Sequence, residues 1–183
     1  MRVVGPFMNA LRRFGLARTG MAATEFAMIA PLMFSLYFGV TELTDGLIVD
    51  TRVTRAASTA ADLVAQDTSI TNAEMTNIFT AIDRIMFPYL TPQTKVVVSS
   101  LVEGSNGTFK VAWSSAHNTT PRAVNSLVSV PAGLVATGGS VIYSEVTHPY
   151  TSPAGELIYG TINLTDTFYS RPRRVAKVGR TVN

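Results

Sequence analysis

Residues 18–26 read Arg-Thr-Gly-Met-Ala-Ala-Thr-Glu-Phe, and this stretch decides how the N-terminal part of the chain folds. A basic leader ends in Gly20, and the fifth residue after this glycine is a lone carboxylate, Glu25. Residues 26–41 follow without a charge and are mostly apolar. A carboxylate at the edge of a bilayer helix costs a few kcal/mol and usually serves a function. The stretch therefore predicts a membrane helix with a functional carboxylate near its start.

The apolar run is long enough to cross a bilayer. Residues 22–41 extend about 30 Å at roughly 1.5 Å per residue. Pro31 lacks a backbone donor and crowds the carbonyl of Ala27, so we expect a helix kink there. The leader holds four arginines and no acid, which predicts that it stays cytoplasmic and that the chain after Thr41 lies outside. An ordinary secretory signal fits less well, because residues 41–45 offer no small-x-small cleavage site after the run.

Charge argues against nucleic-acid binding. The formal net charge is +3, but the basic residues lie mainly at the two ends, and residues 21–170 carry 6 basic and 12 acidic side chains. No basic stripe with interleaved aromatics is present to follow a phosphate backbone. We interpret the basic tail after Ser170 as a solvated structural element, with contact to anionic headgroups as the alternative. The chain has no cysteine, which excludes disulfides and thiolate metal sites.

Two helical patterns follow the apolar run. Apolar residues recur at spacings of four and three, which predicts an amphipathic helix extension over residues 42–67. Its apolar stripe consists of Val49, Val53, Ala56, Ala60 and Leu63. A second, shorter helix begins with a capping box at Thr71 and Glu74 and ends before Pro88. Its apolar face holds Met75, Ile78, Phe79, Ile82 and Ile85 or Met86, and we interpret it as core packing.

The remainder of the chain is rich in strand patterns. Residues 96–102 and 108–114 predict a hairpin about a turn at residues 105–107, and residues 141–147 and 160–170 predict two further strands. Residues 123–130 are compatible with a short helix or a strand, and residues 149–155 predict a loop. The fold class is therefore α+β: a long N-terminal helix, a short second helix and an antiparallel sheet of about four strands.

No constellation for catalysis or cofactor binding emerges. His117 and His148 lack metal-ligand spacing to another histidine or to a carboxylate pair. No Gly-x-Ser-x-Gly motif and no phosphate-binding loop is present. We therefore expect no enzyme activity, no cofactor and no metal. A secreted enzyme would need a catalytic cluster that the sequence does not provide.

The N-terminal pattern resembles the class III signal of type IV prepilins, in which a dedicated peptidase cuts after the glycine. The continuation resembles TadE-like minor pilins and pseudopilins of the bacterial tight-adherence pilus. The resemblance rests on Pro31 in the apolar run, on Gly39 and Glu42 at its exit, on the alanine-rich helix over residues 51–65, and on the C-terminal motif at residues 168–173. It implies cleavage between Gly20 and Met21, with Glu25 and Phe26 serving processing and assembly.

The resemblance, with the patterns above, divides the chain into four parts. These are a leader over residues 1–20, a transmembrane helix over 21–41, its amphipathic extension over 42–67, and a β-rich periplasmic or extracellular head with its basic tail over 68–183. The implied location is the bacterial inner membrane or the surface pilus. The implied partners are a prepilin peptidase, other pilins and the assembly platform. The alternative is an uncleaved single-pass membrane protein with a periplasmic ligand-binding head.

Overall fold

A computed structural model describes residues 20–89, 91–104, 108–131, 133–135, 138–151 and 160–182. The leader before Gly20, the predicted turn at residues 105–107 and residues 152–155 of the predicted loop lie outside these ranges. The chain forms two compact units, Met1–Leu43 and Thr44–Asn183, and each is described by itself. We call the second unit the head.

The first helix, α2, covers Met21–Ala65 and continues through Pro31. Its last third supplies the head with a buried face of small and branched residues: Val49, Val53, Ala56, Ala57, Ala60, Ala61, Val64 and Ala65. The predicted stripe is present except at its end, where Leu63 lies half-buried at the margin and Val64 is fully buried. The alanines have no side chain beyond Cβ, so the helix backbone lies close to the surface it covers.

The second helix, α3, covers Asn72–Met86 and confirms the predicted capping box. The backbone N–H of Thr71 donates to Glu74 Oε2 at 2.7 Å, and the N–H of Glu74 donates to Thr71 Oγ1 at 3.3 Å. The bond from the Thr71 N–H, and a second from Thr71 Oγ1 to Glu74 Oε2 at 2.8 Å, lower the pKa of Glu74, because they stabilise its charged carboxylate. The buried face consists of Met75, Ile78, Phe79, Ile82 and Met86, so Met86 rather than Ile85 completes it.

The sheet contains five antiparallel strands in the order β4-β3-β2-β5-β6. They are β2 (Lys95–Glu103), β3 (Phe109–His117), β4 (Leu127–Val128), β5 (Ser140–Thr151) and β6 (Thr161–Ser170). A short 3₁₀ helix, η2 (Thr91–Gln93), precedes β2. The four predicted strands are present, and β4 shows that the ambiguous stretch includes a short strand. The predicted loop was wrong at its start, because Pro149, Tyr150 and Thr151 continue β5.

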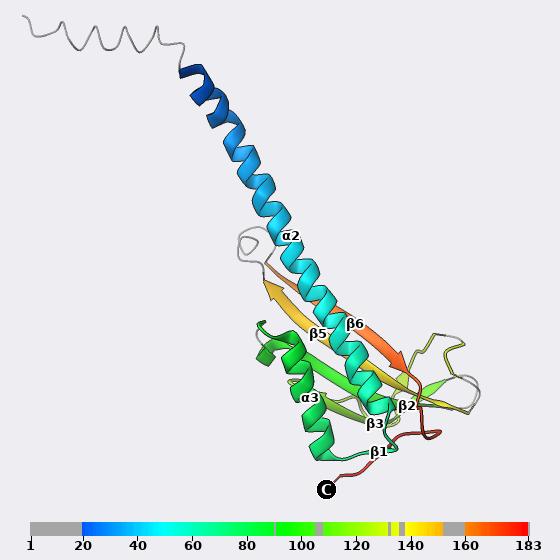
Figure 1. Ribbon diagram of the computed structural model, residues 1–183. Coiled ribbons are helices and arrows are strands. Elements are labelled where there is room, and N and C mark those ends of the chain that lie inside the picture. The colour runs from blue at the N-terminus through cyan, green and yellow to red at the C-terminus, as the bar shows by residue number, and fades with distance from the viewer. Residues whose placement is uncertain are drawn as a thin grey trace, which may run out of the picture. The chain divides into compact units, whose positions relative to one another are not determined.

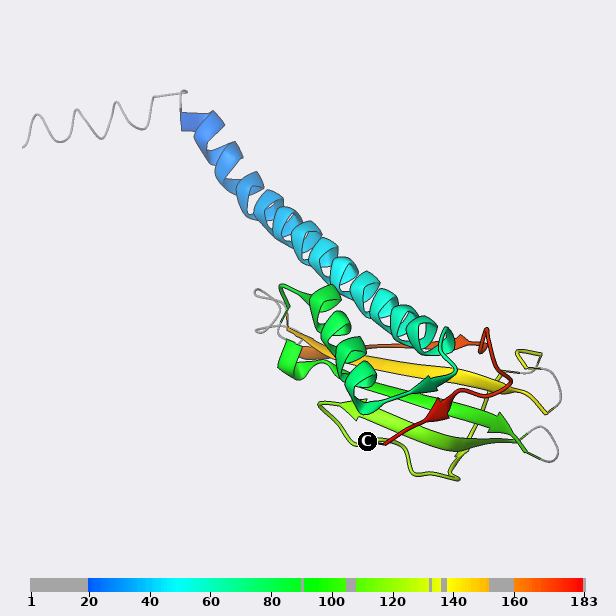
Figure 2. The same cartoon turned by 60° about the horizontal axis from the view of Figure 1, so that its bottom comes forward.

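Both faces of the sheet bury apolar side chains. α3 and the buried part of α2 lie on the same face (Figures 1 and 2) and enclose the main core with strand residues that include Val96, Val98 and Ile142. A smaller cluster around Leu101, Val111 and Tyr143 lies on the other face. A β-bulge interrupts the pairing of β2 with β3. Ser100 pairs with Trp113 and Leu101 pairs with Val111, so Ala112 has no opposite residue on β2. The extra residue turns the side chains of β3 from one face to the other.

The C-terminal tail packs onto the head. Its last strand, β7 (Gly179–Arg180), runs parallel to β1 (Ser69–Ile70), the short strand before α3. Val178 is fully buried, and its carbonyl accepts a hydrogen bond from Trp113 Nε1 at 2.9 Å. Arg180 donates to the carbonyl of Ile70 at 2.9 Å and to Asn72 Oδ1 at 2.6 Å. The interpretation of the tail as a solvated element was therefore incomplete: Arg174 and Lys177 are exposed, but the backbone of the tail closes the core.

Candidate functional site

The residues predicted for processing lie at the start of α2. Gly20 is exposed in a short turn, and the helix begins at the next residue, Met21. Glu25 and Phe26 lie in the second turn, with Phe26 65% exposed. A Cβ atom built on Gly20 would meet no atom within 4 Å. The described structure therefore places no steric demand for glycine at this position, and any such demand has to come from a partner that binds the backbone here.

The apolar part of α2 has no protein cover within its unit. Residues 21–29 and 31–41 are all exposed, including Met28 at 83%, Leu32 at 72% and Leu36 at 70%. The helix is long and apolar enough to cross a membrane. Its serine and threonine hydroxyls donate to carbonyls of the helix itself, as Ser35 does to the carbonyl of Pro31 at 2.8 Å. An uncovered apolar helix whose serine and threonine hydroxyls are bonded internally is consistent with membrane anchoring.

A family model for TadE-like proteins matches residues 20–62. The N-terminal part of this chain is TadE-like. Over these residues the match confirms the resemblance predicted from the sequence, and the TadE-like family implies a protein associated with the tight-adherence (Tad) pilus. No curated protein matches the chain. No solved structure matches it either.

The boundaries of the TadE-like segment are informative. The segment begins at Gly20, the predicted cleavage residue, and ends within the buried part of α2. It therefore includes Met21, Glu25, Phe26 and Pro31 together with most of the helix face that the head buries. The helix kink predicted at Pro31 and the roles of the other residues stay predictions. The sheet and the tail lie outside the matched segment.

The two histidines have structural partners in the head. His117 Nε2 lies 3.3 Å from Asp83 Oδ2, and its ring stacks on Phe79 with centroids 5.2 Å apart. His148 is buried, with Nδ1 2.9 Å from Thr94 Oγ1, and burial lowers its pKa. Within the described residues, no three His, Asp or Glu side chains gather as a possible metal site.

A partly buried ion pair between Arg122 and Glu145 of β5 was not predicted from the sequence. Arg122 holds Glu145 through two hydrogen bonds, of 2.5 and 2.6 Å, and this pairing raises the pKa of Arg122. The guanidinium also lies over the ring of Tyr143, 5.6 Å from its centroid, and Tyr143 stacks on Tyr169 at 4.7 Å. Burial raises the pKa of Tyr143 above its ordinary value, so the phenol stays neutral. Arg122 and Glu145 are 23 positions apart, and no local pattern links them.

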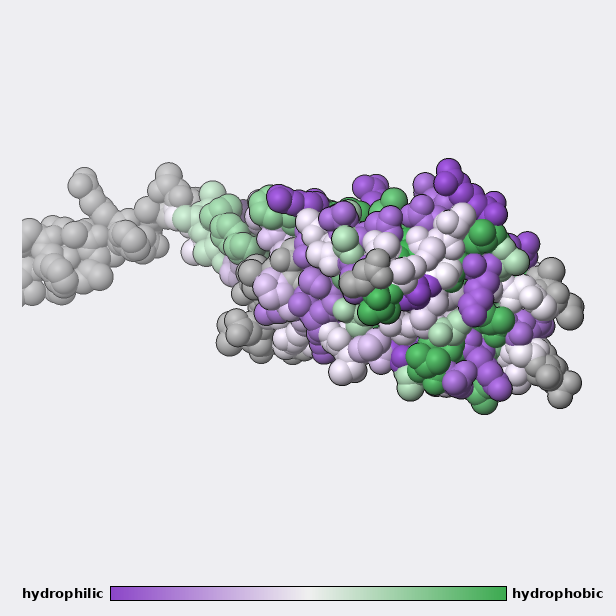
Figure 3. All heavy atoms as spheres, turned by 90° about the horizontal axis from the view of Figure 1, so that it is seen from below, coloured by the Kyte–Doolittle hydropathy of each residue, from purple (hydrophilic) through white to green (hydrophobic). Residues whose placement is uncertain are grey.

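The head surface has no broad apolar patch on the face that Figure 3 shows. Purple and white residues cover most of this face, and the green residues form small separate groups. This mixture is typical of a surface in contact with water. The exposed large apolar side chains are concentrated instead in α2 before Val49.

Proposed function

We propose that this chain is a minor pilin or assembly component of the tight-adherence pilus. In this proposal its leader is cytoplasmic, α2 anchors it in the bacterial inner membrane, and the head lies in the periplasm or, after incorporation, on the surface pilus. A prepilin peptidase cuts between Gly20 and Met21. The observation that carries the proposal is the uncovered apolar helix that begins directly after Gly20 and opens the TadE-like segment.

Processing would give α2 a new amino terminus at Met21. Glu25 would then pair with this amine on a neighbouring pilin, while the apolar residues around Phe26 pack against other helices. Two opposite charges at a dry interface attract strongly, but each alone is costly to bury. The pair would therefore fix the register of neighbouring helices more than it adds net stability. The partners in this proposal are other pilins, the assembly platform and the peptidase, and it assigns no catalytic role.

Intact mass of the membrane-extracted protein tests the cleavage directly. Co-expression with a prepilin peptidase should yield a form that lacks residues 1–20 and begins at Met21. Gly20→Val should abolish this form, because the peptidase must bind an extended backbone with little side chain at the bond it cuts. Gly39→Val is the matched control, since a Cβ at Gly39 also meets no atom within 4 Å.

Two outcomes would contradict the proposal. Wild-type protein that retains its leader beside an active peptidase would favour the uncleaved single-pass protein with a ligand-binding head. Gly20→Val that is cut as well as wild type would show that the glycine is not read by the peptidase. A protease added to intact spheroplasts should digest the head, which tests its periplasmic location separately.

A further inference from the structure

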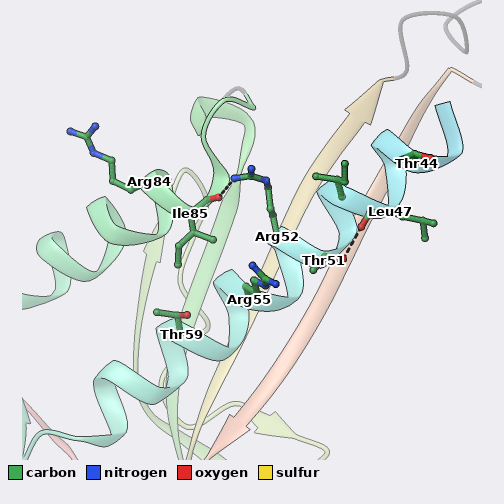
Figure 4. Close-up of a pocket in the computed structure, with 9 residues that line it drawn as sticks. Thr44, Leu47, Thr51, Arg52, Arg55, Thr59, Arg84 and Ile85 are labelled. Atoms are coloured by element: carbon green, nitrogen blue, oxygen red, sulfur yellow. Dashed lines mark hydrogen bonds between the residues drawn. The ribbon is translucent and has the colours of Figure 1, made fainter. Parts of the chain in front are cut away.

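A groove lies between α2 and α3 on the head (Figure 4). From α2 it is lined by Ile48, Thr51 and Arg55, which share one side of the helix because they are spaced by three and four residues. From α3 it is lined by Ile85. Three of the nine described residues that line the groove are arginines, and none is acidic. The groove therefore offers a positively charged surface to a partner.

The three arginines of the groove differ in what they contact. Arg52 is held by the protein, because its Nη1 donates to the carbonyl of Ile85 at 2.7 Å and to that of Phe87 at 2.6 Å. Figure 4 shows the first of these bonds crossing to α3, and it shows Arg84 extending away from α2. Arg55 is exposed, and within the described residues its guanidinium has no hydrogen-bond or ion-pair partner. Arg55 is therefore the charge beside α2 that is left for a partner.

Another side of α2 carries an unpaired negative charge. Asp50 is exposed, and its carboxylate has no partner among the residues that the structure describes. Asp50 and Arg55 are five residues apart, which separates their side chains by roughly 140° around a helix of about 3.6 residues per turn. The two side chains therefore point to different sides of α2. Each is available to a neighbouring molecule rather than to the other.

We propose that the groove binds α2 of a second copy of this chain, through an ion pair between Arg55 and Asp50 of the second copy. The proposal rests on the membrane anchoring in the proposed function, which makes the α2 helices of two copies parallel and sets them at the same depth. In two such helices the level of Asp50 lies about 7.5 Å before that of Arg55, at roughly 1.5 Å per residue. Helical side chains lean toward the N-terminus, so the long side chain of Arg55 extends toward Asp50 of the second copy. Charge and level along the helix thus both favour a second copy.

The contact joins two different surfaces of the chain. Each copy would use its groove for one neighbour and the Asp50 side of α2 for another, so the interface is heterologous and the copies associate in a series. An exposed ion pair alone is weak, because water and salt screen it. Ile48, 43% exposed, and Ile85 add apolar area in the groove beside it.

Introduced cysteines test this contact directly, because the chain has none of its own. Asp50→Cys and Arg55→Cys are placed in two differently tagged full-length copies, which are co-expressed and treated in membranes with a short thiol-reactive cross-linker. The mixed dimer should exceed severalfold the dimer that either variant forms alone, because a heterologous contact does not bring the same site of two copies together. In the matched control Lys110→Cys, exposed on β3, replaces Arg55→Cys and should give no such excess.

Charge reversal tests whether the ion pair holds the copies together. Asp50→Arg and Arg55→Asp, each in both tagged copies, should lower the co-purification of one copy with the other roughly threefold or more, since repulsion replaces attraction. The double variant should restore it, because the pair is re-formed with its charges exchanged. Lys110→Glu, which reverses an exposed charge outside the groove, should leave co-purification unchanged.

The proposal is overturned if the mixed dimer is no more abundant than the control dimer, or if the double reversal fails to restore association. Cross-linking of Arg55→Cys to a different protein in place of the second copy also overturns it. Intact mass of the same samples reports whether residues 1–20 have been removed. Leader-free protein without the mixed dimer contradicts the contact alone. A mixed dimer of protein that keeps its leader supports the contact and contradicts only the proposed processing.

Discussion

At the scale of single residues, local chemistry was the most predictable from the sequence. The capping box at Thr71 and Glu74 was predicted because both partners lie three positions apart and the bonds form within one turn. The pair of Arg122 and Glu145 was not, because the sheet brings together residues that are distant in the chain. Gly20, Met21, Glu25 and Phe26 were proposed because their arrangement resembles a prepilin signal, and their role depends on partners outside the chain.

Glu25 offers the sharpest test of assembly at this scale. Glu25→Ala should leave membrane insertion intact or improved, since it removes a charge from an apolar helix. Cleavage after Gly20 should continue, while association with other pilins falls. Intact mass measures the cleavage, and co-purification of pilins from membranes measures the association. Undiminished co-purification would mean that Glu25 is only an interfacial charge.

His148 should make the head sensitive to acid. It is 4% exposed, and burial lowers its pKa below that in the unfolded chain. The unfolded state therefore binds a proton more readily than the folded state. The stabilising contribution is present above the unfolded pKa of about 6.5 and is lost as pH falls from there toward the lower folded value.

Thermal melts of the full chain in detergent, at about pH 7.5 and at about pH 5, measure this effect around the ordinary histidine pKa. His148→Gln should melt at a lower temperature than wild type near neutral pH, because Thr94 loses its partner in part, but should lose less on acidification. An equal acid-induced drop in both proteins would assign the sensitivity to other groups.

At the scale of elements, the helices and the four long strands were predicted, and the misses have physical causes. Pro149 was predicted to lie in a loop, and a proline cannot donate to a sheet ladder. In the described part of the chain, β5 pairs with β2 only as far as Thr147, and after Thr147 it pairs with β6 alone. Proline is tolerated in a strand that has a neighbour on one side only. The tail was unpredictable for another reason, since β7 pairs with β1 across 110 residues.

The tail should be essential to the core. Ending the chain after Ser170 removes the acceptor of the Trp113 indole, the buried side chain of Val178 and the bonds of Arg180. We expect the free energy of unfolding to fall by several kcal/mol. An unsatisfied buried donor costs about 1–3 kcal/mol, and losing the burial of a valine side chain costs about 1.5–3 kcal/mol. Urea unfolding followed by tryptophan fluorescence measures it.

A chain that ends after Thr181 is the control for this truncation. It retains β7 and the hydrogen bond from the Thr181 N–H to the carbonyl of Ile70 at 2.9 Å. Val182 is 77% exposed, so its removal should have little effect. If the protein truncated after Ser170 had the same unfolding midpoint as this control, the tail would not contribute to the stability of the core.

At the scale of the whole molecule, the predicted boundary between helix extension and head does not coincide with a boundary in packing. The main core includes eight residues of α2, from Val49 to Ala65, together with residues of α3, the sheet and the tail. The helical spacing of these α2 residues could be recognised in the sequence. The surface that they cover could not, because it is formed by strands far along the chain.

The head should therefore fold without its membrane segment but not without the end of α2. A fragment that starts at Thr44 should melt cooperatively, and one that starts at Asp50 should be less stable because it lacks the fully buried Val49. One that starts at Thr68 should not fold, since a few hundred Å² of apolar contact contributes several kcal/mol at about 25 cal/mol per Å². Circular dichroism melts of the three fragments measure this order. Equal melting temperatures would mean that this face of α2 is reserved for another subunit.

The pairing of β7 with β1 has a consequence for biogenesis. The buried part of α2 precedes the rest of the head in the chain, whereas β7, which completes the core, follows all five strands of the main sheet. If the head is exported as proposed, its core would remain open until β7 has crossed the membrane, so chaperones would have access to an incomplete core during most of translocation. A bulky insertion directly after β7 would then delay or prevent closure, and an epitope tag would be better inserted elsewhere in the chain.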